Sequence, residues 1–271
     1  MPTVALPQGT IHYAETGAGR PVVFVHGYLM GGELWQRLAS ELAPLGSHQV
    51  ALRRDADLSP TGLARLIADF LDALDLQDVT LVGNDTGGAL CQLVVTRHPE
   101  RIGRLVLTNC DAFENFPPRA FRPLIWAARA RLLTALIQTM RLRLLQRAPL
   151  AYGWLSARPL PDAVLDEWLA PFLQDRGVRR DTRRAFAGMD PALLLDAAAA
   201  LASFDRPVLI AWARDDRFFP LDHAHRLAAI LPDARVEEIA DARTFVSWDQ
   251  PERLADLVAD FALSERAGAP A

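Results

Sequence analysis

The chain has 271 residues, of which 51% are hydrophobic and 23% are charged. This is the balance of an ordinary globular protein, and it excludes a disordered chain. The net charge of −4 provides no basic field to attract nucleic acid. Only two cysteines occur, which excludes a disulfide scaffold and a cysteine-rich zinc site. All 29 basic residues are Arg, so chemistry that needs a Schiff-base or phosphate-binding lysine is excluded as well.

The hydropathy pattern gives no sign of a membrane segment or of an export signal. No apolar run reaches the roughly 18 residues that span a bilayer. The first residues carry no charged segment followed by an apolar stretch, as a signal peptide would. We therefore expect a cytoplasmic protein without stable membrane insertion.

The first quarter of the chain shows strand patterns followed by helical ones. Apolar alternation over 3–6 and 10–15 predicts a hairpin, and the continuous apolar run 22–25 predicts a strand buried on both faces. Helical spacing follows over 31–43. The only strand candidate before the next helix is 48–52, which is short and polar.

Strands and helices then alternate. Ser59 followed by Pro60 is typical of a helix N-terminus and predicts a helix to Leu74. The later predicted elements are a strand at 79–82, a helix at 89–97, a strand at 105–107, and, after a long interval, a strand at 208–212, a helix at 221–231, a strand at 236–239 and a helix at 251–263.

The interval contains helical patterns and prolines but no convincing strand. This arrangement predicts an α/β fold with a mostly parallel, doubly wound sheet and an inserted helical cap. We expect the core to comprise 1–110 and 204–264, the cap to comprise 111–203, and a flexible tail to follow over 265–271.

The segment 79–89 carries the clearest chemical signal. It joins a buried strand to a helix through the sequence Gly-Asn-Asp-Thr-Gly, centred on Asp85. Small residues on both sides of a central residue permit the sharp strand-to-helix turn that exposes a nucleophile at the edge of a sheet. Asp85 is therefore the candidate nucleophile. The simpler alternative is a plain turn whose Asp caps the helix.

Together with His26-Gly27 after the strand at 22–25 and the Asp-rich loop after the strand at 208–212, this elbow resembles the Asp-nucleophile branch of the α/β-hydrolases. Haloalkane dehalogenases and epoxide hydrolases form that branch. The resemblance implies the α/β-hydrolase fold and a hydrolase that needs no metal and no organic cofactor. His26 is expected to brace its loop rather than to catalyse.

The same resemblance implies roles for further residues. The triad acid falls on Asp216, four residues before a proline, with Asp215 as the alternative. The oxyanion hole would be formed by backbone N–H groups, of which Tyr28 and Thr86 are the candidates.

One position departs from the family in a way that bears on mechanism. The family places a His beside a Phe after the last strand, and here Thr244 precedes the Phe, so the position of the catalytic base is vacant. His223 and His225 are alternatives, but residues two apart on a helix point to different faces. The same spacing argues against a metal site there.

Two further departures concern the substrate. Thr86 stands where the family usually has a Trp, and Tyr152 is the only tyrosine of the predicted cap, whereas epoxide hydrolases use two. Asp111, just after the strand at 105–107, is an alternative triad acid. The cap segment 119–158 is rich in Arg and lacks acidic residues; we favour an amphipathic helix over an anionic substrate, an acidic partner or membrane contact.

Two functions remain open at this point. One is a hydrolase in which Asp85 attacks a small, mostly apolar electrophile, namely an epoxide, a halide or an ester. The other is a non-hydrolytic enzyme or a ligand-binding protein in which Asp85 is a general base or an anchor. Both take a small-molecule partner and no nucleic acid, and both leave a homodimer open.

Overall fold

The central sheet is parallel throughout. The computed structural model describes residues 2–39, 46–47 and 52–264. Within them the sheet has the strand order β3 (Val22–Val25), β5 (Val79–Asp85), β6 (Ile102–Cys110), β7 (Val208–Ala213) and β8 (Ala234–Ile239). All four pairings between these neighbours are parallel. The predicted doubly wound α/β fold is confirmed.

The N-terminal residues form a separate small sheet. Strands β1 (Thr3–Leu6) and β2 (Gly9–Ala14) pair antiparallel, which confirms the predicted hairpin. The short strand β4 (Gly46–Ser47) pairs with β2. Most of the predicted strand at 48–52 and the whole tail 265–271 lie outside the described residues, and Leu52 itself is not in a strand.

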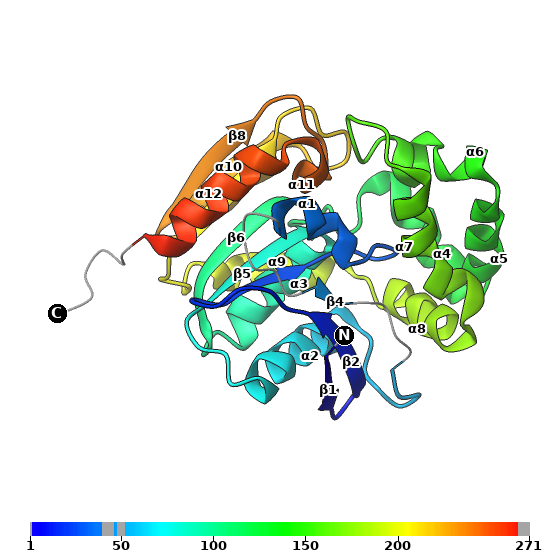
Figure 1. The fold of residues 1–271 in the computed structure, drawn as a ribbon, viewed down its shortest axis with the longest axis horizontal. Helices are drawn as coiled ribbons and strands as arrows, with labels where there is room; N and C mark the ends of the chain where they lie inside the picture. The colour runs from blue at the N-terminus through cyan, green and yellow to red at the C-terminus, as the bar shows by residue number, and fades with distance from the viewer. Residues whose placement is uncertain (1, 40–45, 48–51, 265–271) are drawn as a thin grey trace.

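The helices of the core pack as two groups, one against each face of the sheet (Figure 1). The first group contains α2 (Pro60–Ala73), α3 (Thr86–Arg97), α9 (Pro191–Leu201) and α10 (Leu221–Ile230). The second contains α1 (Gln36–Ala39), α11 (Val246–Asp249) and α12 (Pro251–Leu263). The predicted helix at 31–43 is observed in its described part as a 3-10 helix over Gly32–Trp35 followed by α1.

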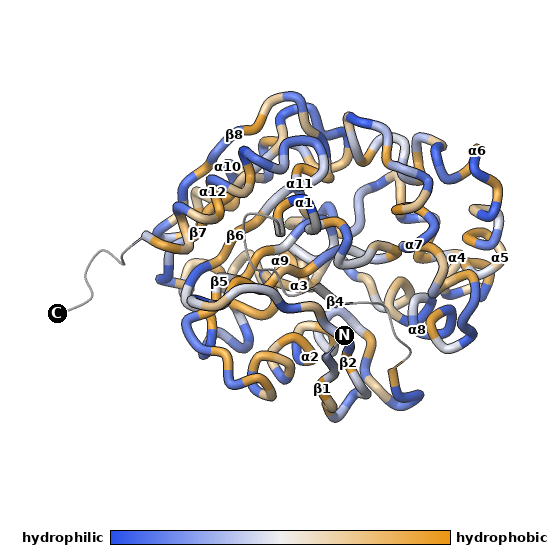
Figure 2. The backbone as a smooth tube through the Cα atoms, viewed as in Figure 1, coloured by the Kyte–Doolittle hydropathy of each residue, from blue (hydrophilic) through white to orange (hydrophobic). Residues whose placement is uncertain are grey.

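The sequence pattern accounts for the central strands and for their helix starts. Every residue of β6 and β7 is buried, as expected for inner strands of a sheet covered on both faces, and the sheet region of Figure 2 is largely hydrophobic. The Ser59 hydroxyl accepts a hydrogen bond of 3.1 Å from the Gly62 N–H, which confirms the predicted cap of α2.

Between β6 and β7 the described chain is helical, with short 3-10 and π segments between the helices. Helices α4 (Arg122–Arg129), α5 (Leu133–Gln138), α6 (Arg143–Gln146), α7 (Asp162–Gln174) and α8 (Arg176–Ala187) gather at one end of the molecule, on the right in Figure 1. Helix α9 then returns to pack against α3 of the core. Among the described residues, no helix is long and apolar enough to cross a membrane.

Candidate active site

The turn between β5 and α3 is strained at its central residue. Asp85 has φ 54° and ψ −132°, a conformation that side chains other than glycine rarely adopt. Gly27 makes room for the Asp85 carboxyl group, and Gly87 lets the start of α3 approach the backbone at the end of β3. A Cβ on Gly27 would lie 2.0 Å from Asp85 Oδ2, and a Cβ on Gly87 would lie 2.2 Å from the Val25 carbonyl oxygen. The predicted sharp turn is thus present, with the carboxyl group held against the loop after β3.

The Asp85 carboxyl lies in a cavity of about 440 Å³ between the sheet and the cap helices. Asp85, Thr86 and Asp111 are the acidic and hydroxyl groups contributed by the strand ends, and most of the other lining is apolar. Apolar lining residues contributed by the cap include Phe121, Leu124, Ile137, Met140, Phe186 and Met189. The size and lining suit a small or medium-sized apolar ligand.

The cavity reaches the molecular surface through leucines of the cap. Leu136 and Leu150 both line the cavity and have exposed fractions of 47% and 55%. An apolar side chain exposed at the rim of an apolar cavity is expected where a ligand enters. We therefore identify this rim as the mouth of the cavity.

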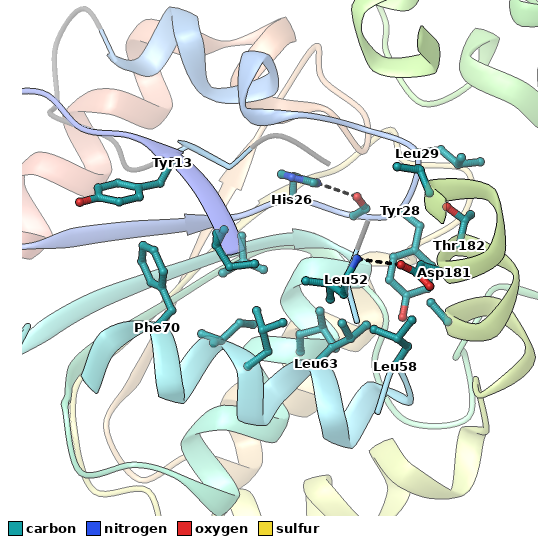
Figure 3. Close-up of a pocket in the computed structure, with 18 of the residues that line it drawn as sticks. Tyr13, His26, Tyr28, Leu29, Leu52, Leu58, Leu63, Phe70, Asp181 and Thr182 are labelled. Atoms are coloured by element: carbon teal, nitrogen blue, oxygen red, sulfur yellow. Dashed lines mark hydrogen bonds between the residues drawn. The ribbon is translucent and has the colours of Figure 1, made fainter. Parts of the chain in front are cut away.

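A second apolar cavity, of about 250 Å³, lies beside α2 (Figure 3). Tyr28 and Leu29 separate it from the first, because both residues line both cavities. His26 lies in this second cavity, and its Nδ1 is 2.8 Å from the Gly27 carbonyl oxygen (Figure 3). His26 does not line the cavity that holds Asp85, which agrees with a bracing role.

Burial dominates the electrostatics of Asp85. It raises the pKa of the carboxyl to about 7, and the negative charge of Asp216 acts in the same direction. A hydrogen bond from the Thr86 backbone N–H opposes this pKa shift because it favours the ionised form. That N–H is one of the two donors expected in the oxyanion hole. Near neutral pH, Asp85 therefore exists in both protonation states.

Asp216 and Thr244 meet directly. The Thr244 hydroxyl donates a hydrogen bond of 2.9 Å to Asp216 Oδ2, while the backbone N–H groups of Phe218 and Phe219 donate to Oδ1 at 2.7 and 3.0 Å. Burial raises the pKa of Asp216 to about 6 despite these donors. Asp215 is exposed. The buried Thr244 hydroxyl thus occupies the place beside Asp216 where the resemblance expects an imidazole.

Asn84 is a site residue that the sequence analysis did not single out. Its buried side-chain amide donates hydrogen bonds of 2.6 Å to the Thr244 carbonyl oxygen and 2.9 Å to the Thr108 hydroxyl. The amide therefore ties the loop of Thr244 to the residue directly before Asp85. The available signal was a polar residue at the end of an otherwise apolar strand.

Asp111 lies beside the elbow at the end of β6. It is fully buried, and neither oxygen of its carboxyl group makes a hydrogen bond of regular geometry with a described residue. Burial and the neighbouring Asp85 hold its pKa well above the ordinary range, while the Thr86 side chain lies close enough to oppose the shift. The backbone N–H of Asp111 donates to the Asp85 carbonyl oxygen at 3.4 Å.

The histidines considered as substitute bases are elsewhere. His223 packs against the ring of Phe113, with 5.9 Å between ring centroids, and His225 lies 3.7 Å from Glu238. None of the described histidines lines the cavity of Asp85. In the described part of the chain there is no group of three or more His, Cys, Asp or Glu side chains that could hold a metal ion.

Tyr152 comes from the cap and lines the cavity. Its hydroxyl donates a hydrogen bond of 2.5 Å to the Leu29 carbonyl oxygen, so its proton is already engaged. This bond also fixes the loop that follows Gly27, next to the expected oxyanion hole.

The family model described as alpha/beta hydrolase fold matches residues 54–251. The chain belongs to this family, and by enzyme class it is a hydrolase. Its relatives include the 2-hydroxy-6-oxo-6-phenylhexa-2,4-dienoate hydrolase of Comamonas testosteroni, 25% identical over 93% of this chain and 90% of the relative. The 2-hydroxy-6-oxononadienedioate/2-hydroxy-6-oxononatrienedioate hydrolase of Paraburkholderia xenovorans is 28% identical over the same shares.

Solved structures agree on the fold. The haloalkane dehalogenase DatA from Agrobacterium tumefaciens C58 has a TM-score of 0.78 at 20% identity and covers 96% of each chain. At this identity the likeness concerns the fold alone.

Proposed function

We propose that the protein is a hydrolase in which the Asp85 carboxylate attacks an electrophilic carbon of a small, mostly apolar substrate and forms an ester. The observation that carries this proposal is the placement of a carboxyl group, rather than a hydroxyl, on the strained elbow that opens into the apolar cavity. A carboxylate can displace a leaving group from carbon and form a covalent intermediate. Epoxides and alkyl halides are the electrophiles that give an ester in this way, and an activated ester would instead give a mixed anhydride with release of its alcohol.

The surroundings of Asp85 support a nucleophile. Apolar walls remove water from the carboxylate, which makes it more reactive than in solution. The Thr86 N–H, with a backbone N–H of the Tyr28 loop, would stabilise the oxyanion formed when the ester is later attacked by water. Asp216 and Thr244 do not line the cavity, and Asn84 would link the loop of Thr244 to the elbow. We place the core at 1–110 and 204–264 and the cap at 111–203 in this proposal.

The activities for which the relatives are named favour a second candidate function. Those proteins are hydrolases of 2-hydroxy-6-oxo-dienoates, in which carbon 6 is a ketone carbon bonded to the carbon–carbon double bond of the dienoate. A C–C hydrolase reaction would use Asp85 as a general base, which its pKa of about 7 suits. The absence of a cation among the cavity-lining residues described here disfavours these anionic substrates.

Intact-protein mass spectrometry tests the proposal. The protein is incubated at pH 8 with an epoxide, a bromoalkane, an activated ester and a 2-hydroxy-6-oxo-dienoate. We expect a mass increase that corresponds to one alkyl group from the bromide, one hydroxyalkyl group from the epoxide or one acyl group from the activated ester, located by peptide mapping on the peptide that contains Asp85. Asp85→Asn should remove the adduct while the fold persists.

Asp215→Asn is the matched control, because Asp215 is an exposed carboxyl on the neighbouring loop. It should leave adduct formation unchanged. An adduct that persists in Asp85→Asn, or turnover of the dienoate alone, would contradict the proposal.

A further inference from the structure

Asp85 and Asp111 are adjacent because of the register between β5 and β6. The register pairs Asp85 with Cys110, so the next residue, Asp111, begins beside the elbow. Both carboxyl side chains line the same cavity. Gln92 fixes the backbone of Asp111 from α3, since its side-chain amide donates a hydrogen bond of 2.8 Å to the Asp111 carbonyl oxygen. The pair is thus held by the sheet and the helix behind it.

The carboxyl group of Asp111 is unusual for a structural residue. A fully buried carboxyl without a regular hydrogen bond costs folding free energy, and such groups are found where they serve chemistry. Its backbone already makes the structural contacts of this position. Many small side chains at position 111 would therefore be compatible with the fold. Structural requirements alone do not explain why this residue is an aspartate.

Two buried neighbouring carboxyl groups cannot readily ionise together, so they share a proton. The pKa of Asp85 is raised to about 7 and that of Asp111 is raised well above its ordinary range, and no cation contributes to either shift. The titratable groups that face the pair are Asp216, the phenols of Tyr28 and Tyr152 and the Cys110 thiol, all with raised pKa values. Asp111 is the more deeply buried of the two, so we expect it to hold the shared proton near neutral pH.

We propose that Asp111 is the proton donor and acceptor of this site, and that it adapts the site to substrates with an oxygen leaving group, of which epoxides are the class that fits. The proposal rests on the proposed function, in which Asp85 is the nucleophile. In this proposal Asp111 is also the base that activates water for hydrolysis of the ester, a role that Thr244 cannot fill.

In the first step the bond from an Asp85 carboxylate oxygen to an epoxide carbon forms while the carbon–oxygen bond of the ring breaks. The ring oxygen takes the proton of Asp111, which leaves a hydroxyalkyl ester on Asp85 and a carboxylate on Asp111. A halide, in contrast, departs as a stable anion and needs no proton. Asp111 therefore matters for the epoxide and much less for the halide.

In the second step the Asp111 carboxylate takes a proton from water, and the resulting hydroxide oxygen bonds to the ester carbon of Asp85. The tetrahedral intermediate then expels the alkoxide, which takes the proton from Asp111 and leaves as a diol. The two carboxyl groups again share one proton. No group other than water and the substrate is consumed.

The test compares 1,2-epoxyhexane with 1-bromohexane in single-turnover rapid-quench experiments, with adduct detected by intact mass. Asp111→Asn keeps the shape of the side chain and removes the transferable proton. We expect its rate of adduct formation with the epoxide to fall by about 10²–10⁴-fold, the usual contribution of general acid–base catalysis. The rate with the bromide should change by less than about tenfold, and the ester should persist longer than in the parent.

The parent protein provides a second measurement that does not depend on the folding of a variant. With the bromide, the rate should rise with pH through about 7 and then reach a plateau, because only the Asp85 carboxylate is required. With the epoxide, the rate should rise and then fall as Asp111 loses its proton. Tyr28→Phe tests the alternative donor, since the Tyr28 hydroxyl makes no hydrogen bond with a described residue, whereas the Tyr152 hydroxyl already donates to the Leu29 carbonyl oxygen.

The outcomes distinguish the role of Asp111 as proton donor from the role of Asp85 as nucleophile. Equal losses with both electrophiles in Asp111→Asn, a plateau with both in the parent, or an epoxide-specific loss in Tyr28→Phe alone would overturn the role of Asp111 and leave Asp85 as the nucleophile. Failure of both electrophiles to modify Asp85 would overturn the proposed function and this inference with it.

Discussion

Asp85 costs the fold stability in two ways. Its backbone adopts a left-handed conformation that is unfavourable for a residue with a side chain, and its carboxyl group is removed from water. Natural proteins keep such features mainly where activity requires them. Because burial of the Asp85 carboxyl group is unfavourable when the group is ionised, we predict a specific pH dependence of the protein's stability.

The ordinary pKa of Asp85 is 3.8, and burial raises it to about 7 in the folded protein. Between these values the folded state binds more protons than the unfolded chain, so stability decreases as the pH rises through this window. Asp85→Asn should consequently raise Tm more at pH 8 than at pH 5, by about 2–4 °C for each kcal/mol gained. Thermal unfolding at the two pH values checks this. A Tm of the variant below that of the parent protein at pH 8 would contradict the conclusion that burial of the ionised Asp85 carboxylate destabilises the fold.

The buried Thr244 gives a second prediction at the scale of one residue. Thr244→His would place an imidazole beside Asp216, which could orient it as a general base. We expect the Asp85 ester to break down about 10²-fold faster in this variant. The measurement is the decay of the adduct mass after excess electrophile is removed. In the double variant with Asp216→Asn the gain should disappear; a gain that survives would assign the base elsewhere.

The position of Gly27 can be tested at the same scale. A methyl group at this residue would overlap the Asp85 carboxyl group, whose Oδ2 would be 2.0 Å away. Gly27→Ala should therefore displace the carboxyl and slow adduct formation by about 10²-fold, because misplacement by about 1 Å has this effect on positioned groups. Rapid-quench rates with the bromoalkane check it, and an unchanged rate would show that the carboxyl reacts from another position.

At the scale of elements, the buried carboxylate of Asp249 is one of the groups that join the predicted cap to the core. Asp249 of α11 accepts hydrogen bonds from the Ser156 hydroxyl at 2.6 Å and from the backbone N–H groups of Ala157, Arg158 and Arg243 at 2.8, 3.0 and 3.0 Å. It thereby joins the segment before α7 to the loop that carries Thr244. Hydrogen bonds to a charged acceptor are the stronger kind.

Asp249→Ala leaves these donors without an acceptor, so we expect it to reduce the free energy of unfolding by about 2–5 kcal/mol. Urea unfolding provides the measurement. Asp256→Ala is the control, because Asp256 is an exposed residue of the next helix, and it should change stability by less than about 0.5 kcal/mol. Equal effects of the two substitutions would show that Asp249 does not fasten the cap.

The secondary-structure elements also show which parts of the fold and of the site could be predicted from the sequence. Buried apolar runs and the Ser59 cap predict the sheet and α2, because their causes are local. The link from Asn84 to Thr244 spans 160 residues and depends on the order of strands, which no local pattern contains. The division at 111–203 remains a prediction, and the packing of α9 on α3 favours a cap that ends earlier.

At the scale of the whole molecule, we expect the apolar rim of the cavity to control which substrates reach Asp85. Leu136 and Leu195 are both 47% exposed, but only Leu136 lines the cavity. Leu136→Trp should narrow the mouth and slow adduct formation with a decyl bromide by about tenfold or more, while ethyl bromide is little affected. Leu195→Trp should affect neither. Equal rates for the two variants with the decyl bromide would indicate another entrance.

The central claim is that Asp85 bonds to the substrate carbon. A single turnover in water enriched in oxygen-18, with enzyme in excess over an epoxide, tests it most directly. An ester intermediate transfers an oxygen of Asp85 to the product and replaces it from water. We therefore expect unlabelled diol and one heavy oxygen in the peptide that contains Asp85. Labelled diol together with an unlabelled Asp85 peptide would contradict the account, because it would show that water attacks the substrate directly.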